Sequence, residues 1–213
     1  GSHQSSDIVR SFARYFTPLN DGGLYVVEDL HCSYWQEFDG GIFQPYSSIA
    51  FFKCLVDVVN HEHWGIEKKR RELLRSFSRK YGVSFDETLL CHVHSVEFFN
   101  SVCVIRKTHP ISNVLGNRVI AGTMEVVVPG HLPLRGSSSS KPNQTENQWT
   151  VRDMPVEEEL LMYLQKVNNL RQAVSERDRQ IASLNQAVAE RDEQITRLNR
   201  SIAEHDGRID NLN

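Results

Sequence analysis

The 213-residue chain contains no run of 18 or more apolar residues, which excludes a conventional transmembrane helix. It also has no basic-then-apolar opening of the kind that directs secretion. Only four cysteines are present, at positions 32, 54, 91 and 103, and none has Cys-x-x-Cys spacing. We therefore expect free thiols in a reducing, cytoplasmic environment.

Positive charge is not in excess either. The net charge is −3 and the pI about 6.3, which argues against a general nucleic-acid-binding protein. Aromatic residues and proline are missing from the end of the chain, where Tyr163 is the last aromatic and Pro155 the last proline. The front can thus build a hydrophobic core, whereas the tail from residue 156 cannot form a globular one.

The front begins with an α/β pattern. Residues 5–18 are expected to form a helix capped by Ser5 or Ser6. Its expected apolar face comprises Ile8, Phe12, Tyr15 and Phe16. After a glycine turn, a buried strand over residues 24–27 runs directly into Glu28 and Asp29. Ligands of open α/β sheets bind at the carboxyl ends of strands, so these two carboxylates are placed for chemistry.

Further elements follow up to residue 107. An amphipathic helix is expected over 47–62, a charged helix over about 66–80, and a hairpin of two strands over 88–107, the first from Leu89 to Phe99. The buried face of the 47–62 helix is expected to hold Ile49, Phe52, Leu55, Val56 and Val59. Residues 108–155 have the composition of a linker, with one isolated strand expected from Val119 to Val128.

The tail, residues 156–213, has the heptad pattern of a coiled coil. The a positions, all aliphatic, are Leu160, Val167, Val174, Ile181, Val188, Ile195, Ile202 and Ile209. The d positions are Tyr163, Leu170, Arg177, Leu184, Arg191, Leu198, His205 and Leu212. We expect one helix of roughly 85 Å that self-associates as a dimer or a trimer.

A 14-residue repeat is superimposed on these heptads. The segment Ala173–Asp178 is echoed by Ala187–Asp192 and Ser201–Asp206, so that Leu alternates with Arg, Arg and His at d. Polar d residues cost stability but can fix register and strand number. Because the pattern breaks off within a repeat, we expect the natural protein to continue past Asn213.

The segment from Gly22 to Trp35 reads Gly-Gly-Leu-Tyr-Val-Val-Glu-Asp-Leu-His-Cys-Ser-Tyr-Trp, and it resembles the late half of class I SAM-dependent methyltransferases. The group it is most similar to is the metal-dependent sugar O-methyltransferases of macrolide and related pathways. The opening Gly1-Ser2-His3 is similar to a Gly-Ser-His segment of that group, and residues 95–105 resemble its final hairpin. Gly-Ser-His is also a common remnant of an expression tag, but the well-matched helix that follows favours a native segment.

This resemblance implies roles for particular residues. Glu28 and Asp29 would bind Mg²⁺ or a similar divalent cation, and His3 would be the general base for a sugar hydroxyl. The substrate-binding residues would be His31, Tyr34 and Trp35. Each assignment has a structural alternative. Glu28 and Asp29 could simply end a strand, and His3 could be an ordinary terminal residue. Tyr34 and Trp35 could pack under the loop without contacting a ligand.

The same resemblance predicts an incomplete enzyme. Residues 1–107 match the last strands of a Rossmann-like methyltransferase sheet, and the Gly-rich turn that binds SAM is missing. We therefore expect this chain alone to be inactive and not to bind SAM usefully. The layout of a methyltransferase joined to a coiled coil is similar to that of bacterial surface-polysaccharide biosynthesis proteins, which implies a sugar or glycan acceptor. The alternative is a non-catalytic scaffold whose coiled coil is an oligomerisation rod or length ruler.

Other candidate sites are weaker. The pairs His61 and His63 and His92 and His94 could each supply two metal ligands, but no further ligand stands at a diagnostic spacing. The basic run over residues 68–71 is interpreted as a solvated helix face, with contact to an anionic substrate or a membrane surface as the minority alternative.

Overall fold

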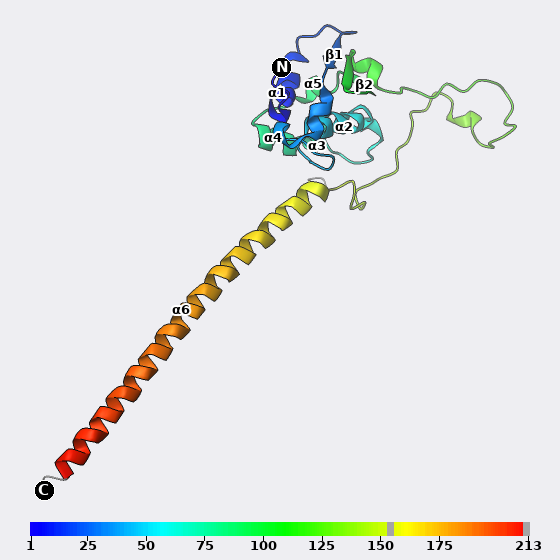
Figure 1. Cartoon of the computed structure of the whole chain (residues 1–213). Coiled ribbons are helices and arrows are strands. Elements are labelled where there is room, and N and C mark those ends of the chain that lie inside the picture. Colours follow the sequence, from blue (N-terminus) through cyan, green and yellow to red (C-terminus); the bar gives the residue numbers. More distant parts are fainter. Residues whose placement is uncertain (153–155, 211–213) are drawn as a thin grey trace. The chain divides into compact units, whose positions relative to one another are not determined.

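A computed structural model describes the backbone of residues 1–152 and 156–210, and the side chains of residues 1–152 and 158–204 (Figure 1). The chain divides into two compact units, Gly1–Glu159 and Leu160–Asn213. Each is described by itself. The heptad positions His205, Ile209 and Leu212 lie outside the described side chains.

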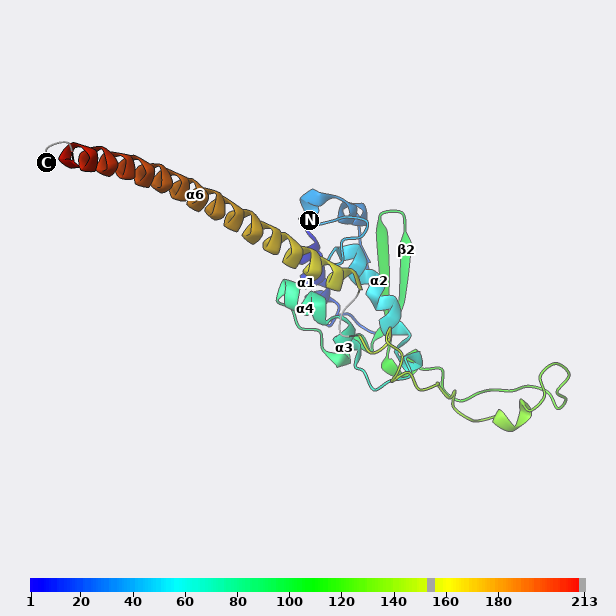
Figure 2. The same ribbon diagram turned by 90° about the horizontal axis from the view of Figure 1, so that it is seen from below.

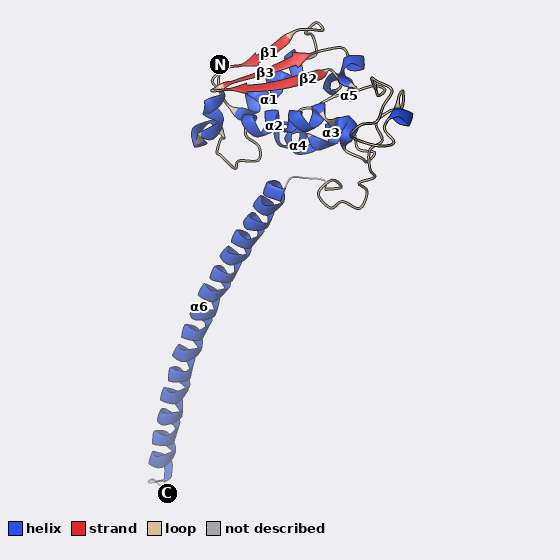
Figure 3. Ribbon diagram, turned by 90° about the vertical axis from the view of Figure 1, so that its right-hand side faces the viewer, coloured by secondary structure: helices blue, strands red, loops and turns tan. Residues whose placement is uncertain are grey.

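The first unit is built on a three-stranded sheet (Figure 3). Its strands are β1 (Leu24–Val27), β2 (Val93–Phe99) and β3 (Val102–Lys107). The order is β1-β3-β2, and β3 is antiparallel to both neighbours. Strands β1 and β2 therefore run parallel to each other at the two edges of the sheet.

Short helices cover one face of this sheet (Figure 3). They are α1 (Ser5–Tyr15), α2 (Ser48–Val59), α3 (Arg70–Leu73), α4 (Arg75–Tyr81) and α5 (Glu87–Leu90). Helix α2 starts at a defined residue because the Ser47 side chain accepts a hydrogen bond from the Ala50 amide at 3.3 Å. In the view of Figure 2, α2 lies beside the hairpin of β2 and β3.

Aromatic rings fill the space between the helices and the sheet. Phe51 lies at the centre, with the rings of Phe12, Phe52, Phe77 and Phe85 at centroid distances of 5.2–5.3 Å. All five side chains are buried. The sheet contributes Val27, Val93, Cys103 and Ile105 to the same core.

The opposite face of the sheet is open in the described part of the chain. Leu24 and Val26 of β1 and Phe99 of β2 are exposed to 46%, 51% and 62%, although all three are apolar. The sequence prediction of a partial sheet agrees with this arrangement. The expected strand over residues 24–27 is confirmed, but only Val27 of it is buried. The final hairpin is confirmed as well.

Several sequence predictions were wrong in detail. Neither Ser5 nor Ser6 caps α1: the N-cap position is Gln4, whose side chain makes no capping hydrogen bond, and the buried Ser5 hydroxyl donates to the Phe38 carbonyl at 3.2 Å. Tyr15 and Val56, both expected in the core, are exposed to 55% and 44%. The charged helix over about 66–80 is divided into α3 and α4, and the region around Leu89 is helical rather than extended.

The linker contains no strand in the described residues 108–152. The segment expected to be extended, Val119–Val128, is irregular, and Val119 and Val127 are exposed to 95% and 88%. A single bridge joins Asn117 and Ser138. A strand needs a neighbouring strand for its backbone groups, and the described residues provide no strand pairing for residues 119–128.

Lys107, at the end of β3, is a buried cation with a structural role. Its ammonium group donates to the backbone carbonyls of Thr17 and Leu19 at 2.6 and 2.8 Å, just beyond the end of α1. The residue as a whole is only 8% exposed. These charge-assisted bonds join β3 to the segment that leads into β1.

Replacing Lys107 by Met should therefore lower the free energy of unfolding by about 2 kcal/mol, because the carbonyls of Thr17 and Leu19 lose a charged donor. Urea denaturation followed by circular dichroism measures the change. Arg106→Met, at the adjacent exposed position of the same strand, is the matched control and should leave stability within about 0.5 kcal/mol. Equal effects of the two variants would contradict this role.

The described residues of the second unit, 160–210, all belong to one helix. Helix α6 runs from Val156 to Asp210, a span of 55 residues, which corresponds to about 80 Å. The predicted long helix is therefore confirmed, while the coiled coil itself requires a partner chain and stays a prediction. Among the described residues, no helix combines the length and apolar character needed to cross a membrane. None of the four cysteines, all of which lie in the described part of the chain, forms a disulfide.

Candidate functional site

The candidate site lies where β1 ends in Glu28 and Asp29. Asp29 has a left-handed backbone with φ of 55° and precedes a 3₁₀ turn, Leu30–Tyr34. That conformation is uncommon for residues other than glycine, and Asp and Asn tolerate it best. The turn is held by a hydrogen bond of 2.9 Å from the Leu30 amide to the carbonyl of Ser101, in the hairpin turn. The hairpin thus fixes the position of Asp29.

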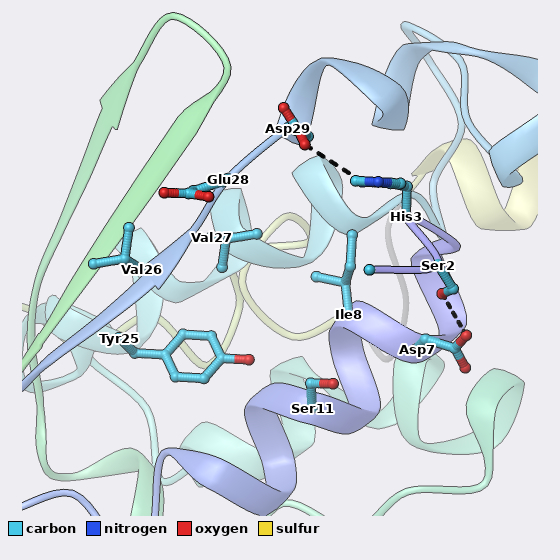
Figure 4. Close-up of a pocket in the computed structure, with 11 residues that line it drawn as sticks. Ser2, His3, Asp7, Ile8, Ser11, Tyr25, Val26, Val27, Glu28 and Asp29 are labelled. Atoms are coloured by element: carbon cyan, nitrogen blue, oxygen red, sulfur yellow. Dashed lines mark hydrogen bonds and ion pairs between the residues drawn. The ribbon is translucent and has the colours of Figure 1, made fainter.

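His3 approaches Asp29 from the segment before α1. Its Nδ1 atom lies 4.0 Å from Oδ2 of Asp29, and the two side chains are 30% and 56% exposed. His3 also has a left-handed backbone, with φ of 58°. Figure 4 shows the Asp29 carboxylate directed toward the His3 ring, while the Glu28 carboxylate is directed away from it. The structure therefore brings together the predicted base and one of the two predicted metal ligands.

These residues border a cavity of about 350 Å³ (Figure 4). Its lining comes from the N-terminal segment, α1 and β1: Gly1, Ser2, His3, Asp7, Ile8, Ser11, Tyr25, Val26, Val27, Glu28 and Asp29. Burial, with a smaller effect of Tyr15, raises the pKa of Tyr25 to about 12. At neutral pH the Tyr25 hydroxyl consequently stays protonated, so it can donate a hydrogen bond in the cavity but cannot act as a base.

A row of aromatic rings extends from His3 along the loop after β1. The centroid distances are 5.9 Å from His3 to Phe38, 6.2 Å from Phe38 to Trp35, and 5.0 Å from Trp35 to His31. At its end, His31 Nδ1 lies 2.5 Å from the Ser101 hydroxyl. Two of the predicted substrate-binding residues thus lie on one surface that leads to the predicted base.

The third predicted substrate-binding residue behaves differently. Tyr34 is exposed to 43% and belongs neither to the row of rings nor to the residues that line the cavity. Trp35 is exposed to a similar degree, 48%, but its ring lies between Phe38 and His31. Stacking against a flat apolar ligand is therefore available to Trp35 and Phe38.

No group of three or more His, Cys, Asp or Glu side chains in the described part of the chain is arranged to hold a metal ion. The two His-x-His pairs have other partners: His61 Nε2 lies 2.8 Å from the Lys68 carbonyl, and His92 Nδ1 lies 3.4 Å from Asp21. For Glu28 and Asp29, the donor chemistry still suits Mg²⁺, which commonly takes one or two carboxylates and leaves its other positions to water and substrate.

The sequence interpretation missed Phe38, Ser101 and Tyr25 as members of this region. Phe38 stood in a loop recognisably rich in aromatics, so its composition was a signal, although nothing marked this ring in particular. Ser101 reaches His31 from a hairpin turn 70 positions away, and no local pattern announces such a contact. Tyr25 was expected in a buried strand, and no sequence pattern indicated where its hydroxyl points.

The chain matches curated O-methyltransferases over a short stretch. It is 46% identical over 65 residues to 8-demethyl-8-alpha-L-rhamnosyl tetracenomycin-C 2'-O-methyltransferase of Streptomyces olivaceus, a stretch that covers 30% of this chain and 17% of that protein. It is 38% identical over 66 residues, 29% of this chain and 16% of the relative, to mycinamicin VI 2''-O-methyltransferase of Micromonospora griseorubida. Demethylmacrocin O-methyltransferase of Streptomyces fradiae is 39% identical over 66 residues, with the same coverage.

Over this stretch the chain is homologous to O-methyltransferases, which confirms part of the predicted resemblance. The matched stretch spans about a sixth of the length of each relative. No profile of a known protein family matches the chain.

Solved structures give a weaker likeness. The MycE methyltransferase from the mycinamycin biosynthetic pathway, in complex with Mg, SAH and mycinamycin VI, is 22% identical, with a TM-score of 0.39 over 52% of this chain and 25% of that chain. A second crystal form, in complex with Mg and SAH, is 20% identical, with a TM-score of 0.42 over 66% of this chain and 32% of that chain. These overlays cover too little of the structures to assign a fold to this chain.

Proposed function

We propose that this chain is part of a SAM-dependent O-methyltransferase that acts on a sugar hydroxyl. The observation that carries the proposal is the cavity at the end of β1, where His3 faces Asp29 at 4.0 Å beside Glu28. The sequence matches to three O-methyltransferases, one of them named for a rhamnosyl substrate, support the reaction class.

The residues at the cavity would have different roles in methyl transfer. Glu28 and Asp29 would hold a divalent cation, which supplies positive charge that makes a nearby sugar hydroxyl more acidic. His3 would accept the proton of that hydroxyl, and Asp29 would stabilise the imidazolium that results. The sugar oxygen would then take the methyl group from the sulfonium of SAM. Trp35 and Phe38 would pack against the apolar face of the acceptor.

The second part of the proposal concerns α6. Its aliphatic a side chains and the Leu side chains at d form an exposed apolar stripe, so the helix would assemble with other helices as a coiled coil, as a dimer or a trimer. The coiled coil would oligomerise or space the enzyme within a larger glycan biosynthesis protein. A non-catalytic scaffold with α6 as a rod or ruler is the competing function, and the exposed stripe supports it equally.

Metal binding separates these two functions on the chain itself. Titration with Mg²⁺ should shift the backbone amide resonances of residues 28–31 in NMR spectra, with a dissociation constant in the millimolar range. Glu28→Gln with Asp29→Asn should abolish the shifts. Glu97→Gln, an exposed carboxylate on β2, is the control and should leave them unchanged. Unshifted resonances at 20 mM Mg²⁺ would favour the scaffold.

SAM should not bind to this chain with useful affinity. The described residues contain no Gly-rich turn after a strand that could hold the cofactor, so calorimetric titration with 100 µM SAM should give no heat of binding. A control titration should use a complete O-methyltransferase under the same conditions. Micromolar affinity for SAM would show that the cofactor site is formed by residues of this chain.

A further inference from the structure

Helix α6 presents a long stripe of unpartnered apolar side chains. At the a positions, Val174, Ile181 and Ile195 are exposed to 59%, 55% and 54%, and at d positions Leu184 and Leu198 to 65% and 63%. A shallow groove follows this edge of the helix, lined by Val167, Leu170, Arg171, Val174, Ser175 and Asp178. Exposure on this scale along one face marks a surface that another helix covers.

Charged residues interrupt the stripe in a regular way. Arg177 and Arg191 occupy d positions, and Asp178 and Asp192 occupy the adjacent e positions. In the described part of α6 none of these four side chains takes part in an ion pair. On the outer face, by contrast, Arg179 pairs with Glu176 at 3.1 Å and Arg197 with Glu193 at 3.4 Å. The charges beside the stripe are thus left for a partner.

We propose that this partner is a second copy of the same chain, aligned parallel and in register, so that Arg177 and Arg191 of each copy pair with Asp178 and Asp192 of its neighbour. This alignment rests on the self-association proposed above and specifies it. In a parallel coiled coil the hole that receives a d side chain includes the e residue of the facing helix. Each Arg therefore meets an Asp, and the two Arg layers each carry as many negative as positive charges.

The spacing of the polar layers argues against other alignments. In an antiparallel pair a residues face d residues, so each Arg would meet an aliphatic a side chain and lose its ionic partner in the layer. A parallel stagger of seven residues would place Arg177 against Leu184 and spoil every d layer. A parallel stagger of 14 residues again places Arg opposite Arg, but it shortens the overlap of the two helices by one 14-residue repeat. Only the in-register alignment keeps the Leu layers apolar over the full helix.

Disulfide cross-linking of the complete chain tests the alignment. With Leu184→Cys, mild oxidation should join identical positions of neighbouring copies within minutes, because in-register d residues face each other. Ser183→Cys, at the adjacent outer position, is the matched control and should cross-link at least tenfold more slowly. The parent chain, with its four native thiols, gives the background.

The outcomes separate the alignment from self-association. Sedimentation velocity is run on the same samples. An assembled chain in which Leu184→Cys cross-links no faster than Ser183→Cys would overturn the in-register alignment while self-association stands. A chain that remains a monomer at all concentrations would overturn both.

A second comparison tests the ion pairs. Asp178→Asn with Asp192→Asn should weaken assembly about tenfold and make it less sensitive to salt. Glu176→Gln with Glu190→Gln removes the same charge from the outer face and should change assembly by less than threefold. Equal effects of the two double variants would overturn the pairing of Arg with Asp across the interface.

Discussion

Replacing Asp29 by Asn is expected to lower the rate of methyl transfer by about 10²–10³-fold in a polypeptide that joins this chain to a SAM-binding segment. Asn tolerates the left-handed backbone at this position, where φ is 55°, so the fold should be retained. The change removes the negative charge that would hold the cation and stabilise protonated His3. Single-turnover transfer of a labelled methyl group from SAM to a sugar acceptor measures the rate.

Asp39 provides a matched control for this experiment. It also has a left-handed backbone, with φ of 57°, but it does not line the cavity. Asp39→Asn should therefore change the rate by less than threefold. If both variants transfer methyl groups as fast as the parent, Asp29 has no role in the chemistry. Partial recovery of Asp29→Asn at raised Mg²⁺ concentration would connect the loss to the cation.

Placing Glu at two a positions of α6, as Ile181→Glu with Val188→Glu, should convert an assembled chain into a monomer of 24.5 kDa. Both side chains are aliphatic, exposed to 55% and 57%, and lie one heptad apart on the stripe. Each assembled copy would bury two unpaired carboxylates, so the association constant should fall by more than about 10³-fold. Sedimentation equilibrium measures the mass.

The control places the same charges outside the stripe. Ser183→Glu with Gln186→Glu occupies the outer c and f positions of the heptad that begins at Ile181, and this variant should assemble like the parent. A double Glu variant at 181 and 188 that still assembles would show that the stripe is not the contact surface.

Local patterns predicted the part of the fold that depends on neighbouring residues. The apolar run at 24–27 forms a strand that ends before Glu28 and Asp29, and the long helix α6 follows from the side-chain period alone. Tyr15 and Val56 were misplaced because both satisfy the helical period, while the actual packing favours Phe12 on α1 and Phe51 on α2. Which sector of a helix meets the sheet depends on tertiary contacts that no local period contains.

The candidate site was predictable only in its carboxylates and its histidine. Contact between His3 and Asp29 follows from the way α1 returns to the end of β1, and the sequence motif indicated that proximity without its geometry. The link from His31 to Ser101 depends on the pairing of β1 with β3, which brings the hairpin turn to the site. Such contacts are set by sheet register, so single-sequence reasoning could not supply them.

The alternation of Leu and Arg along α6 also bears on how such a helix can change during evolution. Gain or loss of one complete 14-residue unit would change the length of the helix by about 21 Å. Each remaining polar d residue would still face a polar d residue of the neighbouring copy. Gain or loss of a single heptad in one of two alleles would set Arg against Leu in mixed assemblies. Length variants of this helix should therefore be inherited in whole units, and a heterozygous or recombinant pair that differs by half a unit should sort into separate assemblies.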